Sequence, residues 1–287
     1  MNGSCGICGS PDRRAWRRQR DWVYMECMSC SAAAMDPFPS PEWSESFYDV
    51  GYFRGGGRDG YLDYTADERQ HRINARNRIR RARRFGATAA LPWLDVGCAV
   101  GYTLDEARQA GFDTHGVELS EWAGNMARDR FGLRVERSLR EVATSRCSEF
   151  GVVSFFQVLE HMPDPVGALT EARSCLQSGG LIIVETWDRG STVARAFGNH
   201  WQQIAPPSVL WIFDRPSLHD VLKRCALKVV SIERTSKAIS LGWATGLLAD
   251  KAPAWARAGL RRLAASPLGR VDINYRLGDL ITVVATT

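Results

Sequence analysis

The feature that most constrains this chain is an apolar run ending in an acidic, glycine-bearing turn at residues 94–101, Leu-Asp-Val-Gly-Cys-Ala-Val-Gly. Glu118 follows twenty-one residues after Gly97, at the end of a second apolar run. A strand that stops at a tight glycine turn lets the backbone approach a ligand closely. A carboxylate that closes the next strand can accept hydrogen bonds from both ribose hydroxyls. The pair therefore predicts a nucleoside cofactor bound to an α/β sheet.

The spacing of the turn distinguishes between two kinds of cofactor. A dinucleotide fingerprint that starts at Gly97 needs glycines at the positions where this chain has Ala99 and Tyr102. Residues 94–106 also contain no lysine or arginine that could meet a pyrophosphate. An acidic rim suits a positively charged sulfonium, and a ribose diol suits Glu118. These residues favour S-adenosylmethionine (SAM) over a nicotinamide or flavin dinucleotide.

Two later segments point to a known family. Residues 150–165 contain a buried type of strand followed by Val-Leu-Glu-His and Pro-Asp-Pro, and residues 179–186 form a turn and a further strand. With these motifs the chain resembles the class I SAM-dependent methyltransferases. It is most similar to the branch that includes the ubiquinone-biosynthesis O-methyltransferases and many sugar and natural-product methyltransferases. The resemblance implies an α/β fold, a Rossmann-like seven-stranded sheet with helices on both faces and an antiparallel last strand.

The same resemblance implies a set of cofactor-binding residues. An arginine of the helix before the first strand contacts the cofactor carboxylate in the quinone enzymes, and its equivalent here falls at Asn77, between Arg76 and Arg78. Ala99 stands where the family usually has a second glycine. The implied residues at the turn, the ribose and the methionine end are Asp95, Gly97, Cys98, Ala99, Gly101, Glu118, Leu119, Phe156 and Gln157.

Methyl transfer needs an aligned nucleophile and, for some acceptors, a base that removes its proton. His161 lies just past strand 150–156 and is the first candidate for that base; the alternative is that it only orders its loop. Glu160, Asp188 and His200 are weaker candidates. Related enzymes often carry a histidine where this chain has Val209. An aromatic acceptor pocket is expected from Trp187, Trp201, Trp211 and Phe213, unless these are core residues.

Four cysteines predict a metal site near the start of the chain. Cys5 and Cys8 form one paired knuckle and Cys27 and Cys30 a second, with eighteen residues between them. This is the spacing of a four-cysteine zinc ribbon, in which each knuckle aims two thiolates at one tetrahedral Zn²⁺. Two disulfides are the alternative. The other cysteines, at 98, 147, 175 and 225, are interpreted as ordinary buried thiols.

Three regions are expected along the chain: a ribbon at 1–40, an aromatic and glycine-rich lid with a helix at 41–90, and a methyltransferase core at 91–287 with an insertion at 235–277. A proline-rich breaker at 37–41 separates the first two regions, and the glycines at 55–57 indicate a mobile segment within the second. The expected strands are 92–96, 113–118, 133–136, 150–156, 180–185, 227–233 and 278–286, and the expected helices are 65–85, 102–110, 120–130, 165–177 and 216–224.

Composition and motifs narrow the class of molecule that accepts the methyl group. The acceptor is expected to be a small molecule, most simply a hydroxyl of a sugar, polyketide or other secondary metabolite, with N- and C-methylation and a SAM-binding protein without turnover as alternatives. Arginines at 13–20 and 72–84 suggest RNA, but no Pro-Pro-Tyr/Phe motif follows strand 150–156, so a solvated helix face is expected instead.

A third interpretation concerns the insertion. Residues 253–266 could form a basic amphipathic helix that enters a membrane to reach a prenylated, lipid-like quinone acceptor, although a cap over the acceptor pocket is the favoured prediction. No apolar run approaches eighteen residues, and the first thirty residues carry arginines and cysteines, so a cytoplasmic protein is expected. The oligomeric state stays open.

Overall fold

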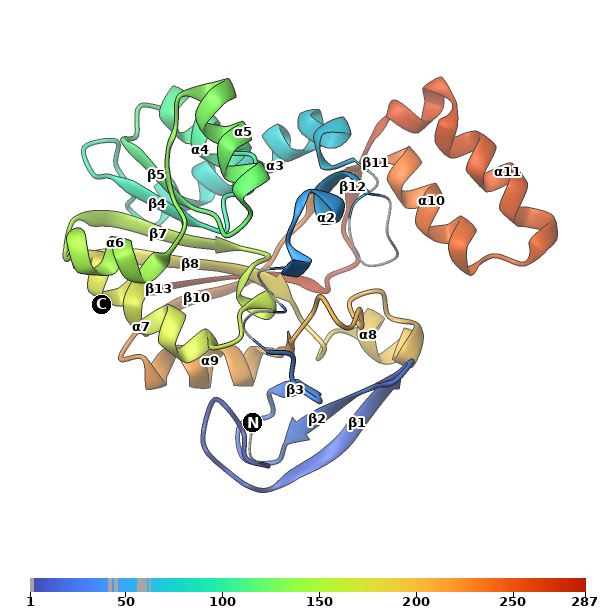
Figure 1. The fold of residues 1–287 in the computed structure, drawn as a ribbon, viewed down its shortest axis with the longest axis horizontal. Helices are drawn as coiled ribbons and strands as arrows, with labels where there is room; N and C mark the ends of the chain where they lie inside the picture. The colour runs from blue at the N-terminus through green and yellow to red at the C-terminus, as the bar shows by residue number, and fades with distance from the viewer. Residues whose placement is uncertain (1–2, 41–42, 44–45, 56–60, 62) are drawn as a thin grey trace.

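The protein is described here by a computed structural model that covers residues 3–40, 43, 46–55, 61 and 63–287. Its centre is a seven-stranded sheet in the order β10-β13-β8-β7-β4-β5-β6 (Figure 1). The strands are β4 (Trp93–Val96), β5 (Thr114–Val117), β6 (Arg134–Glu136), β7 (Phe150–Phe156), β8 (Leu176–Trp187), β10 (Lys228–Arg234) and β13 (Leu280–Thr286). Strands β4 to β8 are parallel, whereas β13 runs antiparallel to both of its neighbours. The predicted mixed sheet with an antiparallel last strand is confirmed.

Helices cover both faces of this sheet, because alternate strand residues are apolar on both sides. One face packs against α6 (Leu139–Ser145), α7 (Pro165–Cys175) and α9 (Arg215–Arg224), and the other packs against α3 (Glu68–Arg84) and α4 (Tyr102–Gln109). Leu94 and Val96 belong to the first core, whereas Trp93, the residue before Leu94, belongs to the second. Helix α5 (Glu121–Phe131) packs beside β6. The two layers leave the carboxyl ends of the parallel strands free to form a site.

The cysteine-bearing segment folds as part of a four-stranded antiparallel sheet. Its strands are β1 (Arg13–Gln19), β2 (Trp22–Cys27), β3 (Ala33–Asp36) and β9 (Trp211–Ile212). Strand β9 comes from the methyltransferase core, and its Trp211 pairs with Ala34 of β3. Tyr24 also donates a hydrogen bond to the Val209 carbonyl at 2.6 Å, and Arg189 forms ion pairs with Glu26 and Asp214. The predicted ribbon therefore shares both a sheet and a hydrophobic core with the larger domain.

The segment before α3 is a cluster of aromatic rings. It contains α2 (Val50–Arg54) and the short helix η1 (Tyr64–Asp67). Tyr48 contacts Tyr52 edge to face, and Tyr64 stacks on His71 and Tyr102. Phe53 is buried among residues of the glycine turn and α5. This cluster thus lies against the predicted cofactor turn. Pro41 and the glycines at 56 and 57, which the sequence analysis singled out, lie outside the described residues.

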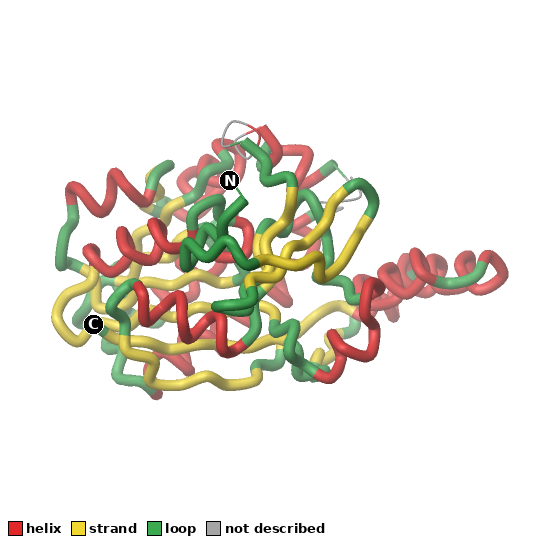
Figure 2. Tube along the Cα trace, turned by 90° about the horizontal axis from the view of Figure 1, so that it is seen from below, coloured by secondary structure: helices red, strands yellow, loops and turns green. Residues whose placement is uncertain are grey.

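The insertion forms a helical hairpin on a two-stranded stalk. Strand β11 (Lys237–Ser240) pairs with β12 (Asp272–Tyr275), and between them lie α10 (Leu241–Lys251), α11 (Ala254–Ala265) and η4 (Pro267–Arg270). Figures 1 and 2 show the hairpin extending away from the body of the molecule. The prediction that it caps the acceptor pocket is therefore wrong. The helices pack mainly on each other and leave Leu248 and Trp255 exposed.

The remaining elements differ from expectation in detail. The helix predicted to reach residue 177 ends at Cys175, because β8 begins at Leu176 and runs beyond the predicted strand to Trp187. Helix α8 (Thr192–Phe197) and the short helices η2 (Leu159–His161) and η3 (Gly198–His200) were not predicted. Within the described ranges, every helix falls short of the length and apolar character needed to cross a membrane.

Candidate functional site

The glycine turn after β4 is held in a conformation that favours residues without a side chain. Gly97, Ala99 and Gly101 have φ angles of +72°, +48° and +87°. A Cβ atom on Gly97 would lie 2.5 Å from Val158, and one on Gly101 would lie 2.6 Å from Leu133. The turn is therefore packed against the loop that follows β7 and against the segment after α5. The left-handed φ of Ala99 explains why a glycine is usual at that position.

Glu118 connects this turn to the end of β5. One carboxylate oxygen accepts from the Ala99 amide at 2.8 Å, and the other accepts from the Ser120 amide at 2.9 Å. Burial raises the pKa of Glu118, and these amide hydrogen bonds oppose that effect. Each oxygen has a second lone pair, so the carboxylate can still accept hydrogen bonds from a diol. The position fits the predicted ribose contact.

Asp95 lies beneath the turn rather than at its surface. It is 3% exposed, and its carboxylate accepts a hydrogen bond from the Ser154 hydroxyl at 2.6 Å. Burial raises the pKa of Asp95 to about 7, against the influence of Ser154 and Arg78. Cys98 is buried nearby, with its thiol directed to the Ala99 carbonyl. Both predicted residues thus support the turn from inside.

A chain of charged and polar side chains lies where the methionine end of SAM is expected. Arg78 donates to Glu185 at 2.5 Å, and Glu185 also accepts from Gln157 at 3.0 Å. The Arg78 guanidinium stacks over Phe156, 4.3 Å from the ring centre. Burial disfavours its charge, but Glu185 outweighs burial and raises the pKa of Arg78. The predicted residues Phe156 and Gln157 are therefore brought together here.

Lys237 completes that chain from the insertion. Its ammonium donates to Gln157 at 2.9 Å and lies 6.0 Å from the centre of the Trp187 ring. Burial lowers the pKa of Lys237 to about 8, and the nearby Arg78 acts in the same direction. The sequence analysis did not identify Lys237. The signal in the sequence that could have drawn attention to Lys237 is the rarity of lysine, since the arginine-rich chain contains four lysines.

Of the two arginines that flank Asn77, Arg78 is the one whose guanidinium joins the polar chain at Glu185. Asn77, to which the alignment of motifs assigned the position of the family's arginine, instead accepts a hydrogen bond from Arg80 on the same helix. A one-residue step along a helix turns a side chain by about 100°, so the difference decides which residue faces the site.

A surface hollow of about 400 Å³ lies beside Glu118, within the size range of small-molecule sites. It lies between the start of α5 and the aromatic segment, and its lining includes the predicted residue Leu119 and the ring of Tyr48. The other lining residues are Asp49, Val50, Ser120, Glu121, Trp122 and Arg137.

His161 is held in one tautomer. Its Nδ1 atom lies 2.6 Å from the Ser208 carbonyl, which can only accept, so Nδ1 carries the proton and Nε2 keeps a lone pair. Burial lowers the pKa of His161 and keeps the ring neutral near pH 7. Tyr48 lies edge-on to the ring and donates to the same carbonyl. His161 thus orders its loop, as the alternative interpretation proposed, while Nε2 remains able to accept a proton.

Three of the four residues expected to form an aromatic acceptor pocket line a narrow slot of about 10 Å³, the size of a single water molecule. Trp187, Trp201 and Trp211 line it together with Val209. Phe213 does not line it and is a fully buried core residue. The other lining residues are Glu160, Thr186, Gln203 and Ile212.

Two of the three weaker base candidates, Asp188 and His200, have other surroundings. Asp188 accepts from the Gly190 amide and pairs with Arg215 at 3.4 Å, so its carboxylate orders the turn after β8. His200 lies in η3, on the segment that leads to Trp201.

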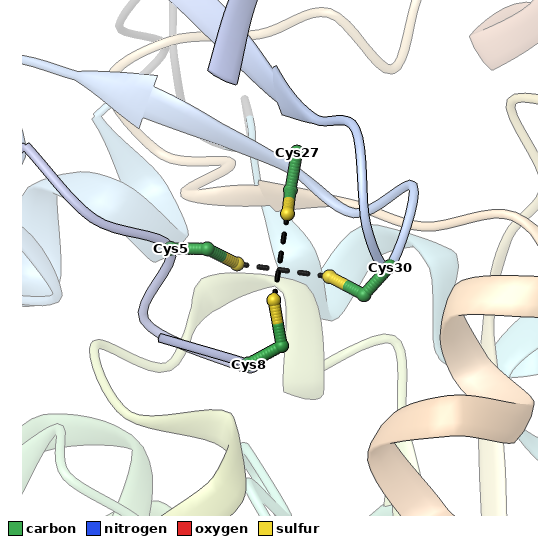
Figure 3. A group of neighbouring side chains, drawn as sticks. All are labelled: Cys5, Cys8, Cys27 and Cys30. Atoms are coloured by element: carbon green, nitrogen blue, oxygen red, sulfur yellow. Dashed lines mark hydrogen bonds between the residues drawn. The ribbon is translucent and has the colours of Figure 1, made fainter. Parts of the chain in front are cut away.

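The four predicted metal ligands are adjacent in space. Figure 3 shows the Sγ atoms of Cys5, Cys8, Cys27 and Cys30 pointing toward a common centre. The Cys5–Cys30 and Cys8–Cys27 sulfur distances are 3.6 and 3.5 Å, and all four sulfurs lie within 4.8 Å of one another. Tetrahedral Zn²⁺ with bonds of about 2.3 Å separates its sulfurs by about 3.8 Å. The arrangement fits that geometry, whereas a disulfide would need about 2.05 Å.

The clustered arginines are largely engaged with acidic groups of this chain. Arg72 pairs with Asp105 and Glu106, and both Arg81 and Arg84 contact Glu233. In the ribbon, Arg13 pairs with Asp36 and Arg14 with Glu26. These pairings support the interpretation of the arginine-rich helix as a charged surface element.

The chain is similar in sequence to known methyltransferases. The family model described as "Methyltransferase domain" matches residues 66–232, more than half of the 287 residues. Ubiquinone biosynthesis O-methyltransferases from Bordetella avium and Methylococcus capsulatus are 31% and 32% identical to it over 102 residues, or 33% of this chain. The matched segment spans only 42% and 43% of those proteins.

A solved structure shows the same fold over a larger part of the chain. A SAM-dependent methyltransferase from Archaeoglobus fulgidus superimposes with a TM-score of 0.53 and 18% identity, covering 78% of this chain and 99% of that one. Taken with the match of the family model, the strand order and the glycine turn, this likeness shows that the protein belongs to the methyltransferase domain family and has the fold of the SAM-dependent methyltransferases.

Proposed function

We propose that the protein transfers the methyl group of SAM to a hydroxyl group of a small molecule. The observation that carries this proposal is the position of Glu118, whose carboxylate joins the glycine turn to the end of β5 at the carboxyl edge of the sheet. Ligands of open α/β sheets bind at that edge. The hollow beside Leu119 and the polar chain from Arg78 to Lys237 border the same edge.

The residues divide into binding and proton-transfer roles. Glu118 and the turn would hold the ribose, and Arg78 with Gln157 would hold the methionine end of SAM. The bound cofactor supplies an already activated methyl group, so the protein needs to align the acceptor and remove its proton. His161 is the proposed base, because its Nε2 atom keeps a lone pair while Nδ1 is fixed on Ser208.

Replacing His161 by asparagine tests that role. Asparagine can still donate to the Ser208 carbonyl but cannot accept a proton at the position of Nε2. Both His161→Asn and His161→Ala are expected to lower kcat by about 100- to 10,000-fold, the usual contribution of a general base. Transfer of radioactive methyl from labelled SAM into acceptors of a source-cell extract is the measurement, and intact SAM binding in both variants is the control. Normal turnover by the asparagine variant would show that His161 only orders its loop.

The pH dependence provides a second readout of the same base. Since burial lowers the pKa of His161, the ring stays neutral and competent through neutral pH. Activity is expected to fall only as the pH drops below the ordinary histidine range of about 6.5. Loss of activity with rising pH from 6 to 7 would contradict this assignment. A wild-type protein that binds SAM but labels nothing in the extract would instead favour the binding-only alternative.

We also propose that the cysteine cluster holds one structural Zn²⁺. Four thiolates in a tetrahedral arrangement fill the coordination sphere and leave no open position for catalysis. The ion would tie the two knuckles together and thereby support the sheet that ends in β9.

The exposed hairpin supports a second candidate, an acceptor in or near a lipid surface. Trp255 is 85% exposed and Leu248 is 59% exposed, on helices that extend away from the body (Figure 2). Arginines at 257, 261 and 262 lie on the same hairpin. Apolar residues next to basic residues are typical of helices that bind anionic membranes. The relatives named for ubiquinone biosynthesis make a lipid-like acceptor a reasonable class to test.

Vesicle binding tests this second candidate. The wild type is expected to sediment with vesicles that contain phosphatidylserine and less with purely zwitterionic vesicles. Trp255→Glu is expected to lower the bound fraction severalfold, because a carboxylate would be placed at the lipid boundary. Leu277→Glu, at an exposed position on the loop before β13, is the matched control. Equal binding by wild type and Trp255→Glu would remove this candidate.

A further inference from the structure

Glu160 is a buried carboxylate without a hydrogen-bond partner among the described residues. It is 3% exposed, and both of its side-chain oxygens are unpaired. Leaving a buried acceptor unpaired costs about 1–3 kcal/mol, and more for a charged group. A group of this kind is retained at a functional site when a ligand supplies the missing partner. Burial raises the pKa of Glu160 to about 7, opposed by its own backbone amide and by the Thr186 hydroxyl, which lie close to the carboxylate but outside hydrogen-bond geometry.

The carboxylate borders the narrow slot described above, whose walls offer few donors. The Trp201 indole N–H donates to Asp279 at 3.0 Å, and the Trp211 N–H donates to the Met162 carbonyl at 3.0 Å. Both rings are thereby fixed with their N–H groups engaged elsewhere, so they line the slot with apolar surface. Glu160 is the one carboxylate in that lining. A ligand group that entered the slot would therefore meet an acceptor surrounded by indole rings.

The slot lies beside the reacting end of the site. Glu160 and the base candidate His161 are consecutive residues of η2, and Trp187 contacts both the slot and Lys237. The charges of Glu185 and Lys237 act on Glu160. The charge of Glu160 in turn raises the pKa of Tyr48 and of Tyr61 in the aromatic segment, so all four groups lie near it. The slot therefore adjoins the proposed base and the polar chain that ends in Lys237.

Size and charge select the chemical group that fits. A volume of about 10 Å³ holds one oxygen atom with its proton. An ammonium group would have to share the space with the positive charge of Lys237, which already acts on Glu160. A neutral hydroxyl fits this volume and is not repelled by Lys237. It can donate a hydrogen bond to the carboxylate while its carbon skeleton stays against the Trp187 ring.

We propose that Glu160 is a specificity-determining residue that binds one hydroxyl group of the acceptor within the tryptophan-lined slot. This proposal rests on the proposed function only in treating the bound molecule as the methyl acceptor. A site that binds a hydroxyl through a buried acceptor rejects an analogue that lacks it, because the carboxylate is then left unpaired. The acceptor class is therefore a compound with a hydroxyl on a ring or a carbon chain, and not a simple hydrocarbon or amine.

Small probes test the proposal without any methyl transfer. Phenol and toluene have nearly the same shape and differ by a hydroxyl in place of a methyl group. The indole N–H signals of Trp187, Trp201 and Trp211 in ¹⁵N-labelled protein report binding at the slot. Phenol or cyclohexanol is expected to bind wild type at least tenfold more tightly than toluene. The better of the two alcohols identifies an aromatic or an aliphatic hydroxyl.

A leucine variant identifies the residue responsible. Glu160→Leu is expected to bind phenol no more tightly than toluene, and Glu141→Leu, at an exposed position on α6, is expected to behave as wild type. The melting temperature of Glu160→Leu should be equal to or above that of wild type, because an unpaired buried carboxylate is removed. A merely structural Glu160 would instead lower it.

Three results would overturn the proposal: equal affinity of wild type for phenol and toluene, unchanged discrimination in Glu160→Leu, or tighter binding of methylammonium than of either alcohol. Hydroxyl binding without methyl transfer would leave this proposal standing and reject the proposed enzymatic function.

Discussion

Glu118→Ala is expected to lower the affinity for SAM by about 100- to 1,000-fold, or about 3–4 kcal/mol. In wild type this carboxylate accepts hydrogen bonds from the Ala99 and Ser120 amides and keeps lone pairs for a ribose diol. Charge-assisted hydrogen bonds of this type contribute about 1.5–3 kcal/mol each. Alanine would remove the ribose contacts and also release the turn that Ala99 helps to form. Titration calorimetry with SAM gives the affinity directly.

Two further variants separate the ribose contact from general damage. Glu118→Gln keeps one carbonyl oxygen and is expected to lose less affinity than Glu118→Ala. Glu141→Ala, an exposed carboxylate of α6, is expected to bind SAM as wild type does. Unchanged affinity in Glu118→Ala, with the fold intact by circular dichroism, would remove the central assignment of the site.

The second large effect is expected from the cysteine cluster. Wild-type protein is expected to contain about one zinc per chain by elemental analysis, and Cys27→Ser to contain almost none. Because binding energy of a structural zinc, about 10–16 kcal/mol in small zinc domains, is largely folding energy, the ribbon should unfold in the variant. Cys27 and Cys30 also belong to the core cluster that contains Trp211, so the melting temperature should fall well below that of wild type.

Cys147→Ser is the matched control for that experiment, since Cys147 is an exposed thiol and not the buried one that the sequence predicted. It should retain its zinc and its melting temperature. Removal of metal from wild type by a chelator should reproduce the Cys27→Ser phenotype. A wild-type protein that is well folded and free of metal would contradict the assignment of the four cysteines.

The parts of the fold that follow from local sequence could be predicted closely. The strand and turn at 94–101 combine an apolar run with Gly97 and Gly101, and both glycines adopt the left-handed backbone that the turn requires. Helix α5 begins at a Ser120 cap and ends at Gly132, signals that are visible in the sequence. The strand order of the central sheet depended on family resemblance, since pairing between distant strands leaves no local mark.

Features that depend on tertiary contacts could not be predicted in this way. Lys237 reaches Gln157 from an insertion eighty residues further along the chain. Arg78 rather than Asn77 faces the site because the rotation of α3 is fixed by Ile79 and Ala82 against the sheet. The unpaired state of Glu160 depends on where the indole N–H groups of Trp201 and Trp211 point. Hydropathy alone also could not show that the α10–α11 hairpin would extend away from the core.

The pairing of β3 with β9 has a consequence for how such chains can diverge. Val209, just before β9, lines the tryptophan-lined slot, and Tyr24 of the ribbon donates a hydrogen bond to the Val209 carbonyl. A change in the ribbon can therefore alter the shape of the slot without any substitution in the methyltransferase core. To exchange acceptor preference between two relatives, the ribbon and the segment around Val209 would have to be exchanged together.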